Sequence, residues 1–176
     1  MTAVPPAAPP GRQRQLTFVT IGVYGFTEAV FFQALQRAGV DTLCDLRWRR
    51  GVRGSDYRFA NSARLQQRLA EAGIRYRHFR ELAPRPELRQ RQAAADKAAG
   101  ASKRQRAALG EAFIAGYREE NLRAFDSRQF LEQLDPDAKV VALLCVEREP
   151  AACHRSLLAE RLQQDLGAAV AHLTPG

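Results

Sequence analysis

The sequence predicts an α/β fold in which a mostly parallel sheet of about five strands is flanked by helices, in a Rossmann-like or flavodoxin-like arrangement. Short β-branched and apolar runs alternate along the chain with longer segments of helical periodicity, and this alternation is typical of a parallel sheet. No internal repeat is present, and 176 residues with 45% hydrophobic content fit one globular domain.

Five runs have the composition of strands. The first is β-branched and is closed by Gly22, and the run that ends at Cys145 is almost entirely aliphatic. The expected strands are residues 16–22, 41–46, 74–77, 139–145 and 168–173.

Helices are expected between these strands. In the first of them Thr27 is a suitable N-cap and Gly39 follows the last turn. The apolar positions expected to face the sheet are Val30, Phe31, Ala34, Leu35 and Ala38. Further helices are expected over residues 62–72 and 153–166, and one or two over 109–134, with Asp126 capping the second.

A single domain is expected from residue 16 to residue 176. Residues 1–15 are rich in Ala and Pro and lack the apolar stretch of a secretory signal, so they predict a disordered tail. Residues 84–108 are polar and weakly periodic, which predicts a helical insertion or lid. The sequence contains no apolar run of 18 residues, so no membrane-spanning helix is expected. Three cysteines without an export signal favour free thiols and a cytoplasmic location.

The positive charge is concentrated in the middle of the chain. The protein carries 27 basic and 19 acidic residues, a net charge of +8, and its isoelectric point is near 10.1. Between Arg47 and Arg106 there are 17 basic and 5 acidic residues. This asymmetry favours an anionic partner. Because only three of the bases are Lys, a genomic preference for Arg is an equally good explanation.

The carboxyl ends of parallel strands meet at one edge of a sheet, where ligand sites form. That rule brings four places together: residues 22–24, which include Tyr24, and residues 45–47, 78–81 and 145–155, the last of them within the denser segment 145–156. An anion could bind in this segment to the backbone N–H groups at the start of a helix, to Arg155 and to Ser156. Glu147 belongs to the same segment. Two alternatives stay open: Arg155 pairs with a carboxylate and orders the loop, and Asp45 pairs with Arg47.

The cysteines and histidines allow a second kind of site. Cys145 or Cys153 near a helix N-terminus could be a nucleophile, with His78 or His154 as acid or base; the alternative is that all four are structural. Cys145, Cys153 and His154 could also ligate a metal. A structural zinc site usually needs four ligands in closer pairs, and Cys44 is expected to point into the core. We therefore expect no metal and no cofactor.

A basic loop follows the second expected strand. Its arginines are interleaved with the aromatic residues Trp48, Tyr57 and Phe59. The arginines could contact the phosphates of a nucleic acid, and the aromatic rings could stack on its nucleobases. A solvated loop is the alternative. The bases are Arg49, Arg50, Arg53 and Arg58, in addition to Arg47.

Several motifs in order resemble the bacterial and archaeal family described as domain of unknown function 488. They are Thr20-Ile21-Gly22, Asp45-Leu46-Arg47, residues 73–78 and the Cys145-to-Ser156 segment. The resemblance covers about residues 16–173. It implies a compact α/β domain and a shared pocket around Gly22, Asp45, Arg47, His78, Cys145, Glu147, Cys153, His154 and Arg155. Two loops depart from the family pattern: residues 48–55 replace a Pro-x-Ser element, and Leu82-Ala83-Pro84 replaces Leu-Gly-Gly.

The leading functional expectation is binding of a phosphorylated ligand, either a nucleotide or a nucleic acid, at the carboxyl rim of the sheet. The phosphate is expected at Arg47, Arg155 and the start of the last helix. One alternative is a cysteine-dependent enzyme of sulfur or phosphoryl transfer. Another is a protein-interaction module whose basic middle meets an acidic partner. No membrane partner is expected.

Overall fold

A computed structural model describes residues 16–100 and 106–176. The expected tail, 1–15, lies outside these residues, as does the segment 101–105 of the expected insertion. No helix in the described part of the chain is long and apolar enough to cross a membrane.

The sheet has five strands, all parallel, in the order β3-β2-β4-β1-β5. The α/β prediction is therefore confirmed. The central strand β4 alternates its side chains, sending Val141 and Leu143 to one face and Ala142 and Leu144 to the other. The strands are β1 (Thr17–Ile21), β2 (Thr42–Asp45), β3 (Arg75–His78), β4 (Val140–Leu144) and β5 (Ala169–Leu173).

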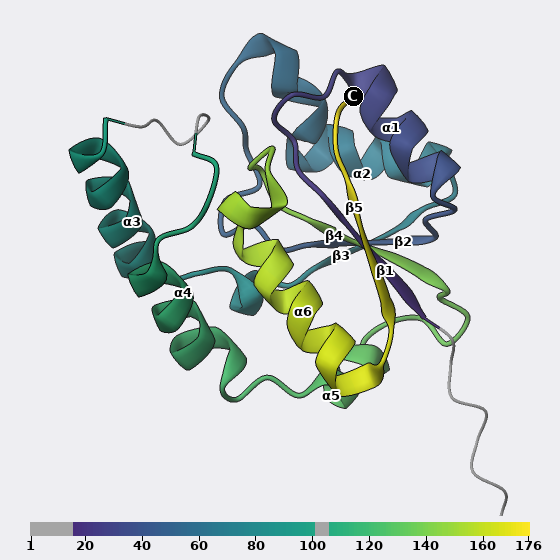
Figure 1. The fold of residues 1–176 in the computed structure, drawn as a ribbon. Helices are drawn as coiled ribbons and strands as arrows, with labels where there is room; N and C mark the ends of the chain where they lie inside the picture. Colours follow the sequence, from purple (N-terminus) through teal and green to yellow (C-terminus); the bar gives the residue numbers. More distant parts are fainter. Residues whose placement is uncertain (1–15, 101–105) are drawn as a thin grey trace, which may run out of the picture.

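Helices cover both faces of the sheet (Figure 1). Helices α1 (Glu28–Arg37) and α2 (Ser62–Glu71) lie on one face, with a 3₁₀ helix (Ser55–Ala60) before α2. Helix α6 (His154–Leu166) crosses the other face, where α4 (Glu111–Tyr117) and α5 (Ser127–Glu132) also pack. Helix α3 (Pro86–Ala98) lies against α4. A π-helical turn (Arg118–Leu122) continues α4, and short 3₁₀ turns occupy Arg80–Leu82 and Pro150–Ala152.

The direction of the chain across the sheet positions the site. From β1 the chain moves through α1 and α2 toward the β3 edge, whereas from β4 it moves through α6 toward the β5 edge. Right-handed crossovers in opposite directions put their helices on opposite faces. The loops after β4 and after its neighbours β1 and β2 therefore diverge, and a crevice opens beyond the carboxyl ends of these strands.

Local signals account for several boundaries. The Thr27 side chain accepts a hydrogen bond from Val30 N at 3.3 Å, and the Asp126 side chain caps α5. Helix α6 ends at Gly167, whose φ of +63° lies in the left-handed region. The expectation that Val30 faces the sheet is wrong: its side chain is 43% exposed. Phe32 is buried instead because the helix turns its aromatic side toward the 3₁₀ helix, where it meets Phe59.

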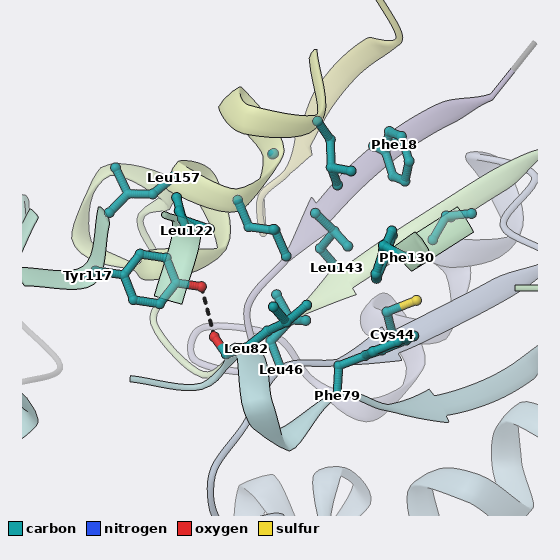
Figure 2. Packing of buried hydrophobic residues seen from close by; sticks show 14 of the residues in the cluster. Phe18, Cys44, Leu46, Phe79, Leu82, Tyr117, Leu122, Phe130, Leu143 and Leu157 are labelled. Atoms are coloured by element: carbon teal, nitrogen blue, oxygen red, sulfur yellow. Dashed lines mark hydrogen bonds between the residues drawn. The ribbon is translucent and has the colours of Figure 1, made fainter. Parts of the chain in front are cut away.

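One of the two cores lies between the sheet and α4, α5 and α6 (Figure 2). Phe18, Leu143 and Leu157 are among its buried residues. The Tyr117 hydroxyl, fully buried, donates a 2.7 Å hydrogen bond to Leu82 O and so ties α4 to the turn after β3.

Candidate functional site

A cavity of about 480 Å³ lies at the carboxyl rim of the sheet. Its floor is built from the segments 145–147 and 152–154, which follow β4 and begin α6. Its walls are the loop after β2 and α3, which is part of the expected insertion. The volume falls within the range of small-molecule sites. The walls are lined by Tyr24, Arg47–Arg49, Gly51–Arg53, Pro84, Arg89, Gln92, Ala93, Asp96, Arg106, Leu109 and Phe113.

Two thiols and an imidazole meet at the cavity floor. His154 Nδ1 lies 3.8 Å from Cys145 Sγ and 3.9 Å from Cys153 Sγ. The other ring nitrogen, Nε2, lies 3.2 Å from Leu46 O. A carbonyl oxygen can only accept, so Nε2 carries a proton and, in the neutral ring, Nδ1 presents a lone pair to both sulfur atoms.

The surroundings of Cys153 favour its thiolate. Burial alone would raise the pKa of this thiol, but the hydrogen bond from Cys145 and the nearby Arg155 guanidinium hold the pKa well below its ordinary value. Cys44 is the opposite case. It lies in the core, as expected, and burial there raises the pKa of its thiol.

Glu147 joins the floor to α3 through a buried arginine. Glu147 Oε2 lies 3.4 Å from Cys145 Sγ, and its Oε1 accepts a 3.2 Å hydrogen bond from Arg106 Nη2. Arg106 also donates to Asp96 of α3 at 2.9 Å, and its side chain is only 9% exposed. Arg106 is thus held by two carboxylates. Sequence reasoning did not select it, because its partners are 10 and 41 residues away.

Asp45 and Arg47 pair with each other in the interior. Arg47 Nε and Nη2 donate to the two carboxylate oxygens of Asp45 at 2.8 and 2.7 Å, and Nη1 donates to Ala60 O. Tyr76 also donates to Asp45. His78 is not among the residues that line the cavity; its Nε2 donates to Arg47 O at 2.9 Å and so supports this pair.

Arg155 orders the loop that forms the floor. It is fully buried, and its Nη1 and Nη2 donate to the carbonyl oxygens of Glu147 and Arg148 at 2.6 and 3.0 Å, while Nε lies 3.4 Å from Thr20 Oγ1. Arg155 does not line the cavity. Ser156 donates to Cys153 O at 2.9 Å, a local contact at the start of α6. Arg155 thus orders the loop, as one alternative held, but its partners are backbone carbonyl oxygens and not the expected carboxylate.

Gly22 lies so close to the same loop that no side chain fits. A Cβ at Gly22 would be 1.9 Å from Glu147 O. Beyond it, Val23 N and Tyr24 N both donate to Val146 O, so the chain after β1 follows the chain after β4. Gly22 therefore permits close packing of the floor, and Tyr24 reaches the cavity.

Arg89 lines the cavity and forms no salt bridge with a carboxylate in the described chain. Its Nε is buried and has no hydrogen-bond partner there. Burial, together with the positive charge of Arg49, lowers the pKa of Arg89. The guanidinium lies 5.9 Å from the ring centroid of Trp48, and Arg80 stacks on that ring at 4.2 Å. Sequence reasoning missed Arg89, because nothing in its polar segment distinguishes it from Arg85 or Arg91.

The basic loop divides between the cavity and the outer surface. Arg49 and Arg53 line the cavity, whereas Arg50 bonds to Tyr76 and Arg58 is exposed on the 3₁₀ helix. The expectation that Phe59 offers a stacking surface is wrong, because this ring is 1% exposed and packs against Phe31. Tyr57 packs edge-on against Tyr24, with centroids 5.2 Å apart.

A family model described as "Domain of unknown function DUF488" matches residues 28–162. The chain belongs to the DUF488 family. The resemblance inferred from the motifs is therefore confirmed. No curated protein and no solved structure matches the chain.

The DUF488 match includes most of the cavity. It covers the paired Asp45 and Arg47, the floor from Cys145 to His154, and Arg89 on α3. Gly22 and Tyr24 precede it. The loop 48–55 and the segment 82–84 supply Trp48, Arg49, Val52 and Pro84 to the lining.

Proposed function

We propose that this DUF488 protein binds a small phosphorylated ligand in the cavity, with the phosphate between Arg89 and Arg49. The observation that carries the proposal is the partly buried Arg89 guanidinium, which has no carboxylate partner in the described residues and lies beside a second positive charge. Withdrawing a charge from water without a partner is unfavourable. An anion between the two arginines would be attracted to both guanidinium groups and would accept hydrogen bonds from their N–H groups.

The composition of the lining supports an anionic ligand with an apolar or ring-shaped body. Five arginines and two carboxylates line the cavity. Arg47 and Arg106 are already neutralised by acidic partners, and Arg155 does not line the cavity. The phosphate is therefore assigned to Arg89 and Arg49 and not to Arg47 and Arg155. Apolar surface is supplied by Trp48, Val52, Leu109 and Phe113, and it suits a nucleoside or a comparable organic group.

Thermal unfolding of the full chain tests the proposal, with inorganic phosphate, nucleoside monophosphates and the corresponding nucleosides as probes. We expect the monophosphates to raise Tm and the nucleosides to have a much smaller effect. A ligand at one hundred times its Kd stabilises the folded state by about 2.7 kcal/mol. If neither phosphate nor any monophosphate raises Tm, the proposal fails.

Two arginines of α3 make a matched pair of variants. Arg89→Gln is expected to abolish the phosphate-dependent shift. Arg91→Gln is expected to retain it, because Arg91 is exposed and pairs with Glu120 at 3.2 Å. Without ligand, Arg89→Gln is expected to be as stable as the parent or more stable, since it removes an unpaired guanidinium. An equal phosphate response in both variants would contradict the assignment of Arg89.

A nucleic acid also carries phosphate groups but is larger than the cavity. It would therefore need basic side chains on the surface outside the cavity as well. Arg58 is exposed and could contact a backbone phosphate. Fluorescence anisotropy with single-stranded and duplex oligonucleotides separates the two cases. Binding that weakens steeply with salt and with Arg58→Gln would favour a nucleic acid. Binding of monophosphates alone would favour a nucleotide.

Thiol chemistry is a second candidate, favoured by the two cysteines on the cavity floor. His154 Nδ1, with its lone pair facing both sulfur atoms, is placed to take a thiol proton, so that a sulfur can attack a bound electrophile. Mass spectrometry after brief iodoacetamide treatment at neutral pH measures this reactivity. Fast alkylation of Cys145 or Cys153 relative to Cys44 would support it. Slow reaction of all three would end it.

A further inference from the structure

Three strong metal-ligand atoms converge at the floor of the cavity. Cys145 Sγ, Cys153 Sγ and His154 Nδ1 all lie within 4.8 Å of one another, and all three residues are buried. They come from the end of β4 and the start of α6, which are held together by the Arg155 contacts to the loop between them. The cluster therefore belongs to the rigid part of the site.

The distances fit a metal centre. For zinc–sulfur bonds of about 2.3 Å and zinc–nitrogen bonds of about 2.05 Å, tetrahedral geometry places the S and N ligands about 3.6 Å apart. The two observed S–N distances are 3.8 and 3.9 Å. The two sulfur atoms lie within 4.8 Å of each other, against about 3.8 Å between two sulfur ligands of tetrahedral zinc. Metal binding therefore draws the two thiols together by at most about 1 Å.

The histidine is already set for coordination. Its Nε2 proton is directed at Leu46 O, so Nδ1 is the nitrogen with the free electron pair. A ligating histidine commonly donates its other N–H to a carbonyl or carboxylate, which fixes the ring orientation. Zn²⁺ with two thiolates and one neutral imidazole has no net charge, as a buried position requires.

We propose that Cys145, Cys153 and His154 bind Zn²⁺ and leave the fourth coordination position open to the cavity. The sequence argument against a metal required a second close pair of ligands, as in structural sites. Zinc sites that exchange a water or substrate need only three protein ligands. All three residues line the cavity, so the open position is available to a water or to an oxygen of a bound ligand.

Titration of the full-length protein, stripped of metal and reduced, tests the proposal with Zn²⁺ against a chromophoric chelator. We expect one tight site per chain. Cys145→Ala and Cys153→Ala are expected to lower the zinc affinity at least about a hundredfold, since loss of an outer-shell contact alone costs 10- to 100-fold. Cys44→Ala is the matched control, because this thiol lies in the core away from the cavity, and it is expected to retain the affinity. Equal affinity in the parent and both floor variants would overturn the proposal.

Cobalt provides a readout that needs no variant, in case a substitution at the buried floor prevents folding. Co²⁺ in the parent protein is expected to give the thiolate-to-cobalt charge-transfer absorption of a two-sulfur site, and Zn²⁺ is expected to displace it. A cobalt spectrum without thiolate bands would show that the cysteines are not ligands and would overturn the proposal.

Discussion

Replacing Asp45 by Asn isolates the energetic role of the buried ion pair below the site. Asp45 is fully buried and accepts hydrogen bonds from the Nε, Nη2 and backbone N of Arg47 and from the Tyr76 hydroxyl. The amide keeps the shape but removes the negative charge and presents an N–H₂ to the guanidinium. Removing one partner of a buried pair costs about 3–5 kcal/mol. For a chain of this size that corresponds to a fall in Tm of about 6–20 °C.

Urea unfolding followed by circular dichroism measures this cost. Glu28→Gln is the surface control, because its partners Arg64 and Arg68 are exposed and such pairs contribute about 0–1 kcal/mol. The double variant Asp45→Asn/Arg47→Met is expected to be more stable than Asp45→Asn alone, since it also removes the uncompensated guanidinium. A cost below about 1 kcal/mol for Asp45→Asn, or a double variant less stable than the single one, would refute the reasoning.

Three further substitutions test other contacts. Gly22→Ala is expected to unfold or strongly destabilise the chain in thermal melts, because its Cβ would overlap Glu147 O; a melt like the parent's would contradict this. Tyr117→Phe, which leaves Leu82 O without its donor, is expected to lower the unfolding free energy in urea by about 1–3 kcal/mol, and a neutral effect would contradict the contact. Burial and Arg155 lower the pKa of His172, so its protonation opposes folding. The folded state should keep its full stability above the ordinary histidine pKa of about 6.5 and lose part of it as the pH falls toward the lower pKa of His172 in the folded state. His172→Gln is expected to reduce this loss in urea unfolding measured as a function of pH. The same pH dependence in the variant and the parent would contradict this role of His172.

Much of the fold follows from local signals in the chain. The alternation of apolar runs with helical periodicity predicts all five strands, and Thr27, Asp126 and Gly167 mark helix ends where the structure has them. The face of α1 was less predictable. Val30 and Phe32 are both apolar, and only the position of the 3₁₀ helix decides that Phe32 is the buried one.

The position of the candidate site follows from the sequence, but the role of each arginine in it does not. Parallel strands bring their carboxyl ends together whatever their order, so the motifs after β1, β2 and β4 could be placed on one rim. The strand order decides which of them touch. Because β4 lies between β1 and β2, its loop contacts both, and His78 at the end of β3 supports Arg47 instead of lining the cavity.

The sequence by itself determined an α/β domain, a basic middle and a family motif at the carboxyl rim. The tertiary structure alone decided which guanidinium groups are already satisfied. Arg155 is held by backbone carbonyls and Arg47 by Asp45, whereas Arg89 faces the cavity with no ionic partner among the described residues. The physical reason is that an arginine's availability depends on the acceptors around it. Those acceptors are mostly backbone oxygens and carboxylates that come from distant parts of the chain only when it folds.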